Sequence, residues 1–199
     1  NNAPYERWSI APPRLEDIYN FEDALLVGSM LITFLRHCDR IKIACLAQLV
    51  NVIAPIFTQT GGGIFAQTIF YPFEHLSNFG RGVALNPIIS SPKYDCKAYT
   101  DVPFLESIAT FDEENEEMTV FCVNKSMNEG MTLDVNLLDF DGYKPFEFIS
   151  MDGYDKNDVN SFENPFVKPH NNPLPEFDDK TLTAQIKPFS WNVIRLKKM

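Results

Sequence analysis

Apolar residues dominate the first long patterned segment of the chain, from Arg14 to about His37, and recur at helical spacing. They fill most faces of the segment, so the pattern predicts a helix that is buried on most sides. Pro12 and Pro13 stand at its start, where proline is tolerated because the first backbone N–H groups of a helix have no partner. The apolar positions are Leu15, Ile18, Ala24, Leu25, Val27, Met30, Leu31, Ile32, Phe34 and Leu35.

A continuous apolar run, IKIACLAQLV, follows at residues 41–50 after a short polar turn. Because the run does not alternate, it predicts a strand of a parallel sheet that is covered on both faces. A glycine loop follows at residues 60–63. A second helix is predicted from Phe65 to Phe79, with Pro72 near a kink or a break and Gly80 at its end. Helix, short turn and buried strand form the αβ half of a repeating βα unit.

Beyond residue 83 the pattern changes to short β-like segments that are divided by turns. The segment from Ser107 to Asn124 predicts a hairpin, because two apolar runs flank an acidic tip. Residues 150–180 are rich in Asn, Asp and Pro and predict a long surface loop. Several strands at this spacing, with no helix between them, are typical of an antiparallel sandwich. The β-like segments are VALNPIIS, FLESIATF, MTVFCVNKS, MTLDVNLLDF, KPFEFISM, TLTAQIK and FSWNVIRLKK.

We therefore expect two unequal parts in one chain. Residues 1–82 are predicted to be α/β, and residues 83–199 are predicted to form an antiparallel β-sandwich. The fold class is thus mainly β, with an α+β arrangement of the whole. A chain of 199 residues with 45% hydrophobic residues has the length for one large domain, or for one complete domain plus a piece of another.

Net charge and cysteine content limit the kind of partner that the protein is expected to bind and the cell compartment in which it is expected to occur. The formal net charge is -10 and no basic cluster occurs, which argues against a nucleic-acid partner and against an anionic membrane surface. The longest apolar run is about half as long as a membrane-spanning helix requires. The four cysteines match no zinc pattern, and Cys45 and Cys122 are expected to be buried free thiols. With no N-terminal signal pattern, we expect a cytoplasmic protein.

The predicted strand at residues 41–50 contains one candidate for a binding residue, Gln48. Burying an unpartnered amide costs roughly 1–3 kcal/mol, so a buried Gln needs a specific hydrogen-bonding partner. Catalytic and binding groups of parallel α/β folds lie at the carboxyl ends of strands, and Gln48 lies late in its strand. The alternative is an amide that neighbouring backbone satisfies. Asn51 is expected to cap a helix or a loop.

Other polar residues give weaker candidates. A carboxylate cluster within residues 16–23 is interpreted as a solvated helix edge. The dipeptide Glu74-His75 is a possible acid/base pair, although one dipeptide is weak evidence. Residues 152–163 resemble a calcium loop in composition, but they lack the required alternation and the glycine at the sixth position. The three histidines are scattered along the chain, so no metal site is expected.

Several long segments resemble one enzyme family. WSIAPPRLEDIYNFEDALLVGSMLITFLRHCDRIKIACLAQLVNVIAPI and QTIFYPFEHLSNFGRGVALNPIISSPKYD closely resemble the α-L-arabinofuranosidases of glycoside hydrolase family 51. VNSFENPFVKP resembles a family segment in which Asn-x-x-x-x-Pro precedes the final strands, and FSWNVIRLKK resembles the family's last strand. The resemblance covers essentially the whole chain.

The resemblance implies a (β/α)8 barrel followed by a β-sandwich of jelly-roll type. Residues 1–82 would then be the last barrel elements (a helix, the eighth strand and a helix), and residues 83–199 the C-terminal sandwich. Family members remove terminal α-L-arabinofuranosyl groups from polysaccharides and oligosaccharides with retention of configuration, and they use two glutamates and no cofactor. The nucleophile lies in an Asp-Glu-Trp-Asn type motif, which does not occur here. Both catalytic glutamates are therefore expected outside this chain.

The resemblance also implies a role for particular residues and partners. Gln48 matches the position whose amide contacts the arabinose ring in family members, and Trp8 would lie near the entrance of the site. The expected partners are an arabinose-containing oligosaccharide, the N-terminal barrel portion of the same protein, and a second copy of the chain in a homo-oligomer. The alternative function is a non-catalytic sandwich that binds carbohydrate or protein.

Overall fold

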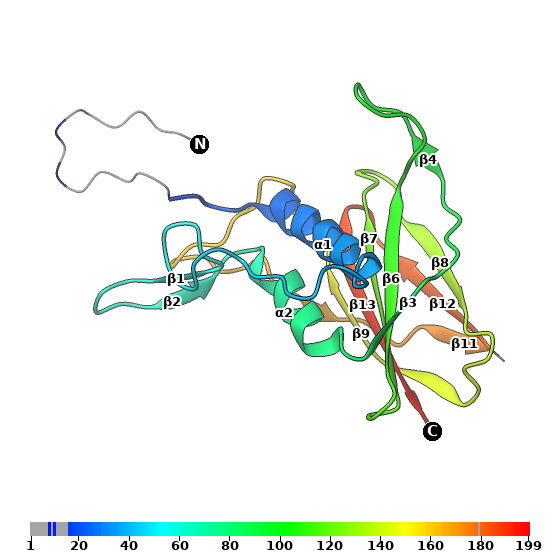
Figure 1. Cartoon of the computed structure of the whole chain (residues 1–199). Coiled ribbons are helices and arrows are strands. Elements are labelled where there is room, and N and C mark those ends of the chain that lie inside the picture. The colour runs from blue at the N-terminus through cyan, green and yellow to red at the C-terminus, as the bar shows by residue number, and fades with distance from the viewer. Residues whose placement is uncertain (1–7, 9, 11–15, 179) are drawn as a thin grey trace.

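A two-layer antiparallel β-sandwich forms the larger part of the structure, a computed structural model that describes Trp8, Ile10, residues 16–178 and residues 180–199 (Figure 1). One layer is a six-stranded sheet in the order β10-β9-β13-β7-β6-β3, and the other is a three-stranded sheet in the order β11-β12-β8. The strands of the first layer are β3 (Val83–Leu85), β6 (Leu105–Asp112), β7 (Glu117–Asn124), β9 (Tyr143–Met151), β10 (His170–Asn171) and β13 (Ser190–Lys198). Those of the second are β8 (Met131–Asn136), β11 (Glu176–Asp178) and β12 (Thr181–Ile186). The predicted fold class, a sandwich preceded by helical elements, is confirmed.

The central strands of the six-stranded sheet, such as β7 and β13, are buried on both faces, which explains their near-continuous apolar runs. Successive side chains of a strand point to opposite faces. In β7, Val120 and Cys122 therefore face the three-stranded sheet, whereas Phe121 and Val123 face the helical side. Burial raises the pKa of the Cys122 thiol to about 12. The predicted burial of Cys122 is thus confirmed.

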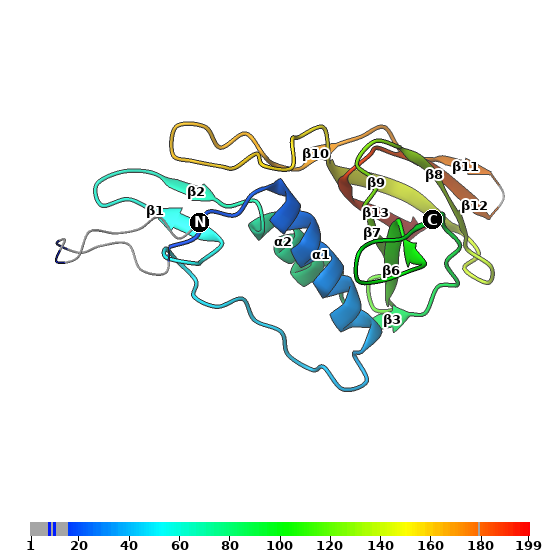
Figure 2. The same ribbon diagram turned by 90° about the horizontal axis from the view of Figure 1, so that it is seen from above.

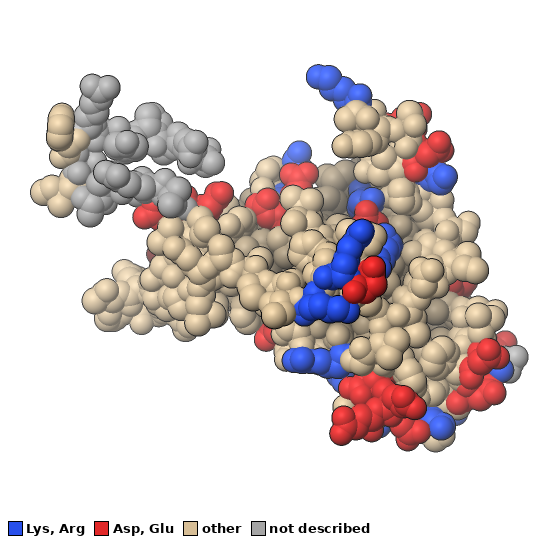
Figure 3. Space-filling view, in the orientation of Figure 1, with Lys and Arg blue, Asp and Glu red and all other residues tan. Residues whose placement is uncertain are grey.

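The predicted hairpin is also confirmed. Strands β6 and β7 pair in register from Leu105↔Asn124 to Asp112↔Glu117. The intervening turn carries the acidic residues of the tip, and Figure 3 shows acidic side chains gathered at this end of the sandwich. Repulsion among these carboxylates is tolerated because the tip projects into water, where the dielectric constant is high.

Helix α1 (Phe21–Arg36) is shorter than predicted, because its start is fixed by a capping box. The Asn20 side chain accepts a hydrogen bond from the backbone N–H of Asp23, and the Asp23 carboxylate accepts one from the backbone N–H of Asn20. The predicted start at Arg14, with Pro12 and Pro13, lies outside the described residues. Residues 16–20 are not helical, so the prediction was wrong there.

Helix α1 packs on the face of the six-stranded sheet that the second layer does not cover (Figure 2). Its buried residues share one apolar cluster with β6, β7 and β13. The closest approach is at Gly28, where an added Cβ would lie 2.7 Å from Trp191 Cε3. Only glycine therefore allows the helix to approach the indole ring this closely. The cluster contains Phe21, Ala24, Leu25, Ile32, Ile108, Phe121, Val123, Ile149, Met151, Val167, Trp191 and Val193.

The predicted strand at residues 41–50 does not form in this structure. The segment crosses the surface without pairing, apart from an isolated parallel bridge between Val50 and Ile56, and most of it is exposed. A parallel strand needs neighbours on its edges to satisfy its backbone groups, and the described chain supplies none along this segment. Cys45, predicted to be buried, is consequently exposed.

A hairpin and a second helix follow. Strands β1 (Ile56–Thr58) and β2 (Ile64–Ala66) flank the glycine loop, so Phe65 belongs to a strand and not to the helix predicted there. Helix α2 (Phe70–Phe79) begins later and ends at Gly80 as predicted. Pro72 lies in its first turn, where the missing N–H causes no kink.

Two further segments complete the molecule. Strands β4 (Lys93–Tyr94) and β5 (Val102–Pro103) form a short ribbon beyond β6. The predicted loop at residues 150–180 is mostly loop, with short β10 and β11 inside it. Asn160 joins this loop to the hairpin of β1 and β2, since its amide donates to Ala66 O at 3.0 Å. The same amide donates to Val167 O, within the loop, at 2.8 Å. Among residues 16–178 and 180–199, no helix has both the length and the apolar character that a membrane crossing requires. The division into two domains at residue 82 stays a prediction.

Candidate functional site

Gln48 lies at the edge of an open cleft of about 400 Å³ between residues 44–49 and helix α2. Its backbone has φ 58°, which turns the chain sharply at this position. Within the described residues its side chain is exposed and makes no hydrogen bond, so both the donor and the acceptor of the amide are available to a ligand. The structure therefore places Gln48 in a concave site and does not bury it as a satisfied core amide.

Helix α2 supplies the opposite wall of this cleft. Phe70 and Phe73 provide apolar surface, and Glu74 provides a carboxyl group. Partial burial raises the pKa of the Glu74 carboxyl above its usual value. An amide, a carboxyl and aromatic rings are suited to bind a polyhydroxylated ligand. Retaining glycoside hydrolysis, however, requires two carboxylates that face one bond, and among the described residues Glu74 is the only carboxylate that lines the cleft.

The predicted acid/base pair Glu74-His75 is not brought together. Glu74 lines the cleft, whereas His75, also on α2, is buried and its Nδ1 accepts a hydrogen bond from Trp191 Nε1 at 3.0 Å. Burial lowers the pKa of His75 to about 4, so the ring is neutral at physiological pH. His75 is thus a structural partner of the buried indole, and this alternative interpretation was wrong.

The remaining polar candidates have structural roles. Asn51 caps the loop before β1, as predicted, because its side chain accepts from Thr58 N at 2.7 Å and donates to Thr58 Oγ1 at 3.1 Å. In the carboxylate cluster, Glu16 and Asp17 precede the helix and are exposed, and Asp23 caps it. Trp8 is almost fully exposed, and its predicted place near the entrance of a site stays a prediction.

Gln67 is a buried amide that the sequence did not single out. Its Oε1 accepts from Tyr19 N at 2.9 Å, and its Nε2 donates to Ala54 O at 2.8 Å. This one side chain joins the segment before α1 to the loop before β1. Gln67 is an amide within an apolar run of the sequence, IFAQTIF. The same feature, an amide among apolar residues, singled out Gln48.

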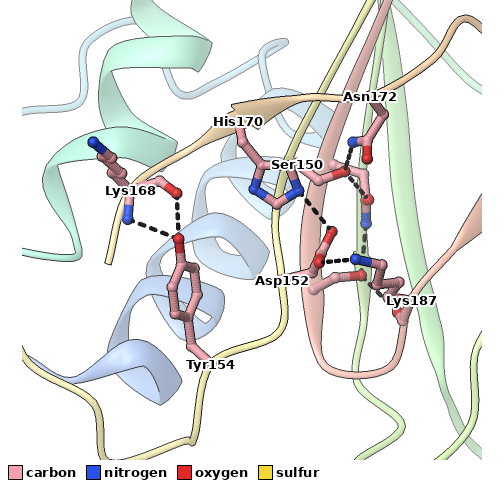
Figure 4. A network of polar contacts seen from close by, with 9 residues as sticks. Ser150, Asp152, Tyr154, Lys168, His170, Asn172 and Lys187 are labelled. Atoms are coloured by element: carbon pink, nitrogen blue, oxygen red, sulfur yellow. Dashed lines mark hydrogen bonds and ion pairs between the residues drawn. The ribbon is translucent and has the colours of Figure 1, made fainter. Parts of the chain in front are cut away.

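A polar network joins the long loop to the sandwich (Figure 4). The buried Asp152 carboxylate contacts Lys187 Nζ at 2.8 Å and His170 Nε2 at 3.5 Å. Ser150 Oγ donates to Asn192 Oδ1 and accepts from Asn172 Nδ2. Ser150 lies opposite His170 in the pairing of β9 with β10, but within the described residues the two side chains share no hydrogen bond. The arrangement is therefore no Ser-His-Asp triad. Because Asp152 is engaged by the side chains of Lys187 and His170, it is not available to the calcium loop that residues 152–163 resemble.

Solved structures with the same fold define the class of protein. A family 51 α-L-arabinofuranosidase from Bifidobacterium longum matches with a TM-score of 0.85 and 36% identity over 96% of this chain and 38% of that chain. An α-L-arabinofuranosidase from Thermotoga maritima, solved with arabinose, matches with a TM-score of 0.80 over 96% of this chain and 41% of that chain; its identity of 23% shows the fold alone. The class is therefore a helix-bearing β-sandwich, which these two solved proteins contain as part of a longer chain.

The family follows from the sequence comparison. The α-L-arabinofuranosidase C-terminal domain family matches residues 2–190, and this chain belongs to that family. An intracellular exo-α-(1→5)-L-arabinofuranosidase from Halalkalibacterium halodurans is 55% identical over 96% of the chain, and one from Bacillus subtilis is 52% identical over 97%. The chain spans 38% of the length of each of these relatives.

Proposed function

We propose that this chain is the C-terminal portion of a retaining α-L-arabinofuranosidase that removes terminal non-reducing α-L-arabinofuranosyl residues from polysaccharides and oligosaccharides. The observation that carries the proposal is the family match over residues 2–190. The names of the relatives from H. halodurans and B. subtilis support exo action on arabinofuranosyl groups and an intracellular location. Both catalytic glutamates belong to the rest of the enzyme, which requires no metal or organic cofactor.

Within that enzyme, Gln48 contacts the sugar. Three observations support this role: the resemblance of its segment, its position in a cleft and its free amide. A side-chain amide donates to one hydroxyl and accepts from another, so it discriminates between sugars by the placement of their hydroxyl groups. Glu74 and the rings of α2 form the wall behind it and orient the segment that carries Gln48.

The partner that completes the site is the N-terminal barrel portion of the same protein. Ile43 and Leu49 are 84% and 73% exposed, and the face over β1 and β2 carries few charges (Figure 3). A solvated apolar segment of this kind indicates a surface that another part of the protein covers. Alone, the chain is expected to self-associate through this face. In the full-length protein, residues 41–50 then pair as a barrel strand.

Activity assays on two lengths of the protein test the proposal. The full-length protein is expected to hydrolyse an aryl α-L-arabinofuranoside, and the 199-residue chain is expected to give only background turnover. Turnover that scales with the concentration of the short chain contradicts the assignment of the glutamates. Failure of the full-length protein on every arabinofuranoside contradicts the function.

A single variant tests the role of Gln48 in the full-length protein. Gln48→Ala is expected to lower kcat/KM by about tenfold, since a lost hydrogen bond to a sugar costs on the order of 1.5 kcal/mol. Gln185→Ala, an exposed amide on β12, is the matched control and is expected to leave kcat/KM unchanged. A Gln48→Ala enzyme with normal kinetics and a lower Tm identifies a structural amide instead.

A further inference from the structure

Helix α2 lies between the Gln48 cleft and the sandwich, and it presents different side chains to each. The residues that line the cleft are three or four positions apart, which places them on one face of the helix. They are Phe70, Phe73, Glu74 and Ser77. The opposite face contains the buried His75 and packs on the apolar cluster to which Trp191 belongs. Any rotation of α2 about its axis therefore moves the wall of the cleft.

Helix α2 is not held in one orientation by its own sequence. It has 10 residues, and its N-cap residue, Ile69, makes no side-chain capping hydrogen bond. A helix this short is marginal in water, so its position depends on what it packs against. Apolar contacts are non-directional, and they hold a helix against a surface more strongly than they select one rotation of it. A directional contact is needed to fix the rotation.

The hydrogen bond between Trp191 and His75 is such a contact. The indole Nε1 can only donate, so His75 Nδ1, at 3.0 Å, is unprotonated and accepts. Burial lowers the pKa of His75 to about 4, which keeps this acceptor available at physiological pH. Within the described residues, no other side chain of α2 forms a hydrogen bond with the sandwich. A further bond, from Thr110 Oγ1 to Phe79 O at 3.3 Å, holds the last residue of the helix.

The Trp191 ring can serve as a fixed reference because it is itself held on several sides. It is fully buried on β13, which pairs with strands on both edges. The Phe121 ring stacks on it with a centroid distance of 5.9 Å. Gly28 of α1 approaches it so closely that an added Cβ would lie 2.7 Å from Cε3. An indole held in this way cannot follow a shift of α2, so the helix adapts to the indole.

We propose that Trp191 and His75 are positioning residues for the cleft: their hydrogen bond fixes the rotation of α2 and thereby holds Phe73 and Glu74 opposite Gln48. The inference rests on the proposed function, because that function assigns the sugar to this cleft. Neither Trp191 nor His75 touches the sugar, and both act through the wall that α2 provides. The sandwich thus determines the shape of a site that lies outside it.

Kinetics of the full-length enzyme test the role of His75. His75→Leu removes the acceptor and is expected to raise KM for an aryl α-L-arabinofuranoside about fivefold, the effect of one lost hydrogen bond. The kcat is expected to change less than about twofold, because the catalytic glutamates belong to the rest of the enzyme. His75→Asn is the conservative variant, since its Oδ1 can accept in place of Nδ1, and it is expected to restore KM.

Variants of β13 separate positioning from a general loss of stability. Trp191→Phe is expected to raise KM as His75→Leu does, and the double variant is expected to raise it no further, because only one hydrogen bond is lost. Ile194→Ala is the matched control, since Ile194 is fully buried on the opposite face of the same strand. It is expected to lower Tm and leave KM unchanged. An equal rise in KM for Ile194→Ala overturns the proposal.

Alkylation of Cys45 gives a second measurement that does not depend on activity. Cys45 lines the cleft opposite α2 and is exposed. In the full-length protein, iodoacetamide is expected to modify Cys45 about threefold faster in His75→Leu than in the parent or in His75→Asn, because a released helix opens the cleft. Mass spectrometry of the peptide that contains Cys45 follows the reaction.

The two measurements distinguish failure of this inference from failure of the proposed function. Equal alkylation rates in the parent and His75→Leu overturn the inference, whatever the activity. Unchanged KM in an active His75→Leu enzyme also overturns it. A parent protein with no turnover, together with faster alkylation of Cys45 in His75→Leu, contradicts the function and supports the positioning of α2 by His75.

Discussion

Two apolar runs of this chain, each containing one cysteine, differ in burial and in strand pairing. Residues 41–50 are mostly exposed and, apart from the bridge at Val50, unpaired, whereas β7 is buried from Met118 to Asn124 and pairs with strands on both edges. Both runs satisfy the pattern of a strand covered on both faces. The difference is that β7 pairs with β6 and β13, which belong to the described chain, whereas residues 41–50 have no such neighbouring strands there. An apolar pattern therefore predicts the capacity to be buried, and the partner decides whether burial occurs.

The largest expected difference between the two runs is in hydrogen exchange. In the isolated chain, amides of β7 are expected to exchange at least about a thousandfold more slowly than those of residues 41–50, because they open only when the sandwich unfolds. In the full-length protein, residues 41–50 are expected to gain protection. Mass spectrometry of deuterated peptides measures both. Equal protection of the two runs in the isolated chain contradicts the comparison.

Side-chain truncation sharpens the same comparison. Phe121→Ala in β7 is expected to lower the free energy of unfolding by about 3–5 kcal/mol, since the ring is fully buried against Trp191. Leu49→Ala in the exposed run is expected to change it by less than about 0.5 kcal/mol. Urea unfolding of both variants of the isolated chain provides the measurement. A large effect at Leu49 would show that the run is packed in solution.

Acid is expected to weaken the attachment of α2 to the sheet. The pKa of His75 is about 4 in the fold, below the ordinary 6.5, so the unfolded chain takes up the proton first as the pH falls. This contribution to the free energy of unfolding is fully present above about pH 6.5, and up to about 3 kcal/mol of it is lost between pH 6.5 and 4. His75→Gln is expected to flatten the stability profile in that window, measured by denaturation at a series of pH values. Parallel profiles for the two proteins argue against a neutral, buried His75.

The smallest expected difference is in the stability change caused by truncating two glutamines, Gln67 and Gln48. Gln67→Ala is expected to destabilise the isolated chain by about 1–3 kcal/mol, because it leaves Tyr19 N–H and Ala54 C=O without a partner. Gln48→Ala is expected to leave the stability of the isolated chain unchanged, since its side chain makes no hydrogen bond with any residue that the structure describes. Thermal unfolding of both variants decides. A lower Tm for Gln48→Ala assigns that amide to the fold.

The sandwich was predictable from the sequence because its signals are local. The short β-like runs, the turn residues that divide them and the acidic tip between Ser107 and Asn124 each depend on residues that are neighbours in the sequence. The start of α1 was also encoded locally, in the pairing of Asn20 with Asp23, but the prolines upstream drew the prediction earlier. The unpaired state of residues 41–50 was not predictable, because the pairing of a strand depends on neighbours that a local pattern does not reveal.

The candidate site was predictable in part. The pattern singled out Gln48, and the structure places it in a cleft with Glu74. Its role as a sugar contact rests on the family resemblance and stays a proposal. The separation of Glu74 from His75 was not predictable, because it depends on Trp191, which approaches from the opposite end of the sequence.

The close approach of Gly28 to Trp191 has a consequence for the order of folding. Helix α1 packs its buried face on β6, β7 and β13, and β13 lies far away along the chain, so docking is complete only after residues 190–198 have been synthesised. Contacts of such long range form late and slowly. During translation, helix α1 is thus expected to dock fully only when β13 has joined the sheet, and the sandwich then acts as the template on which the preceding segments settle.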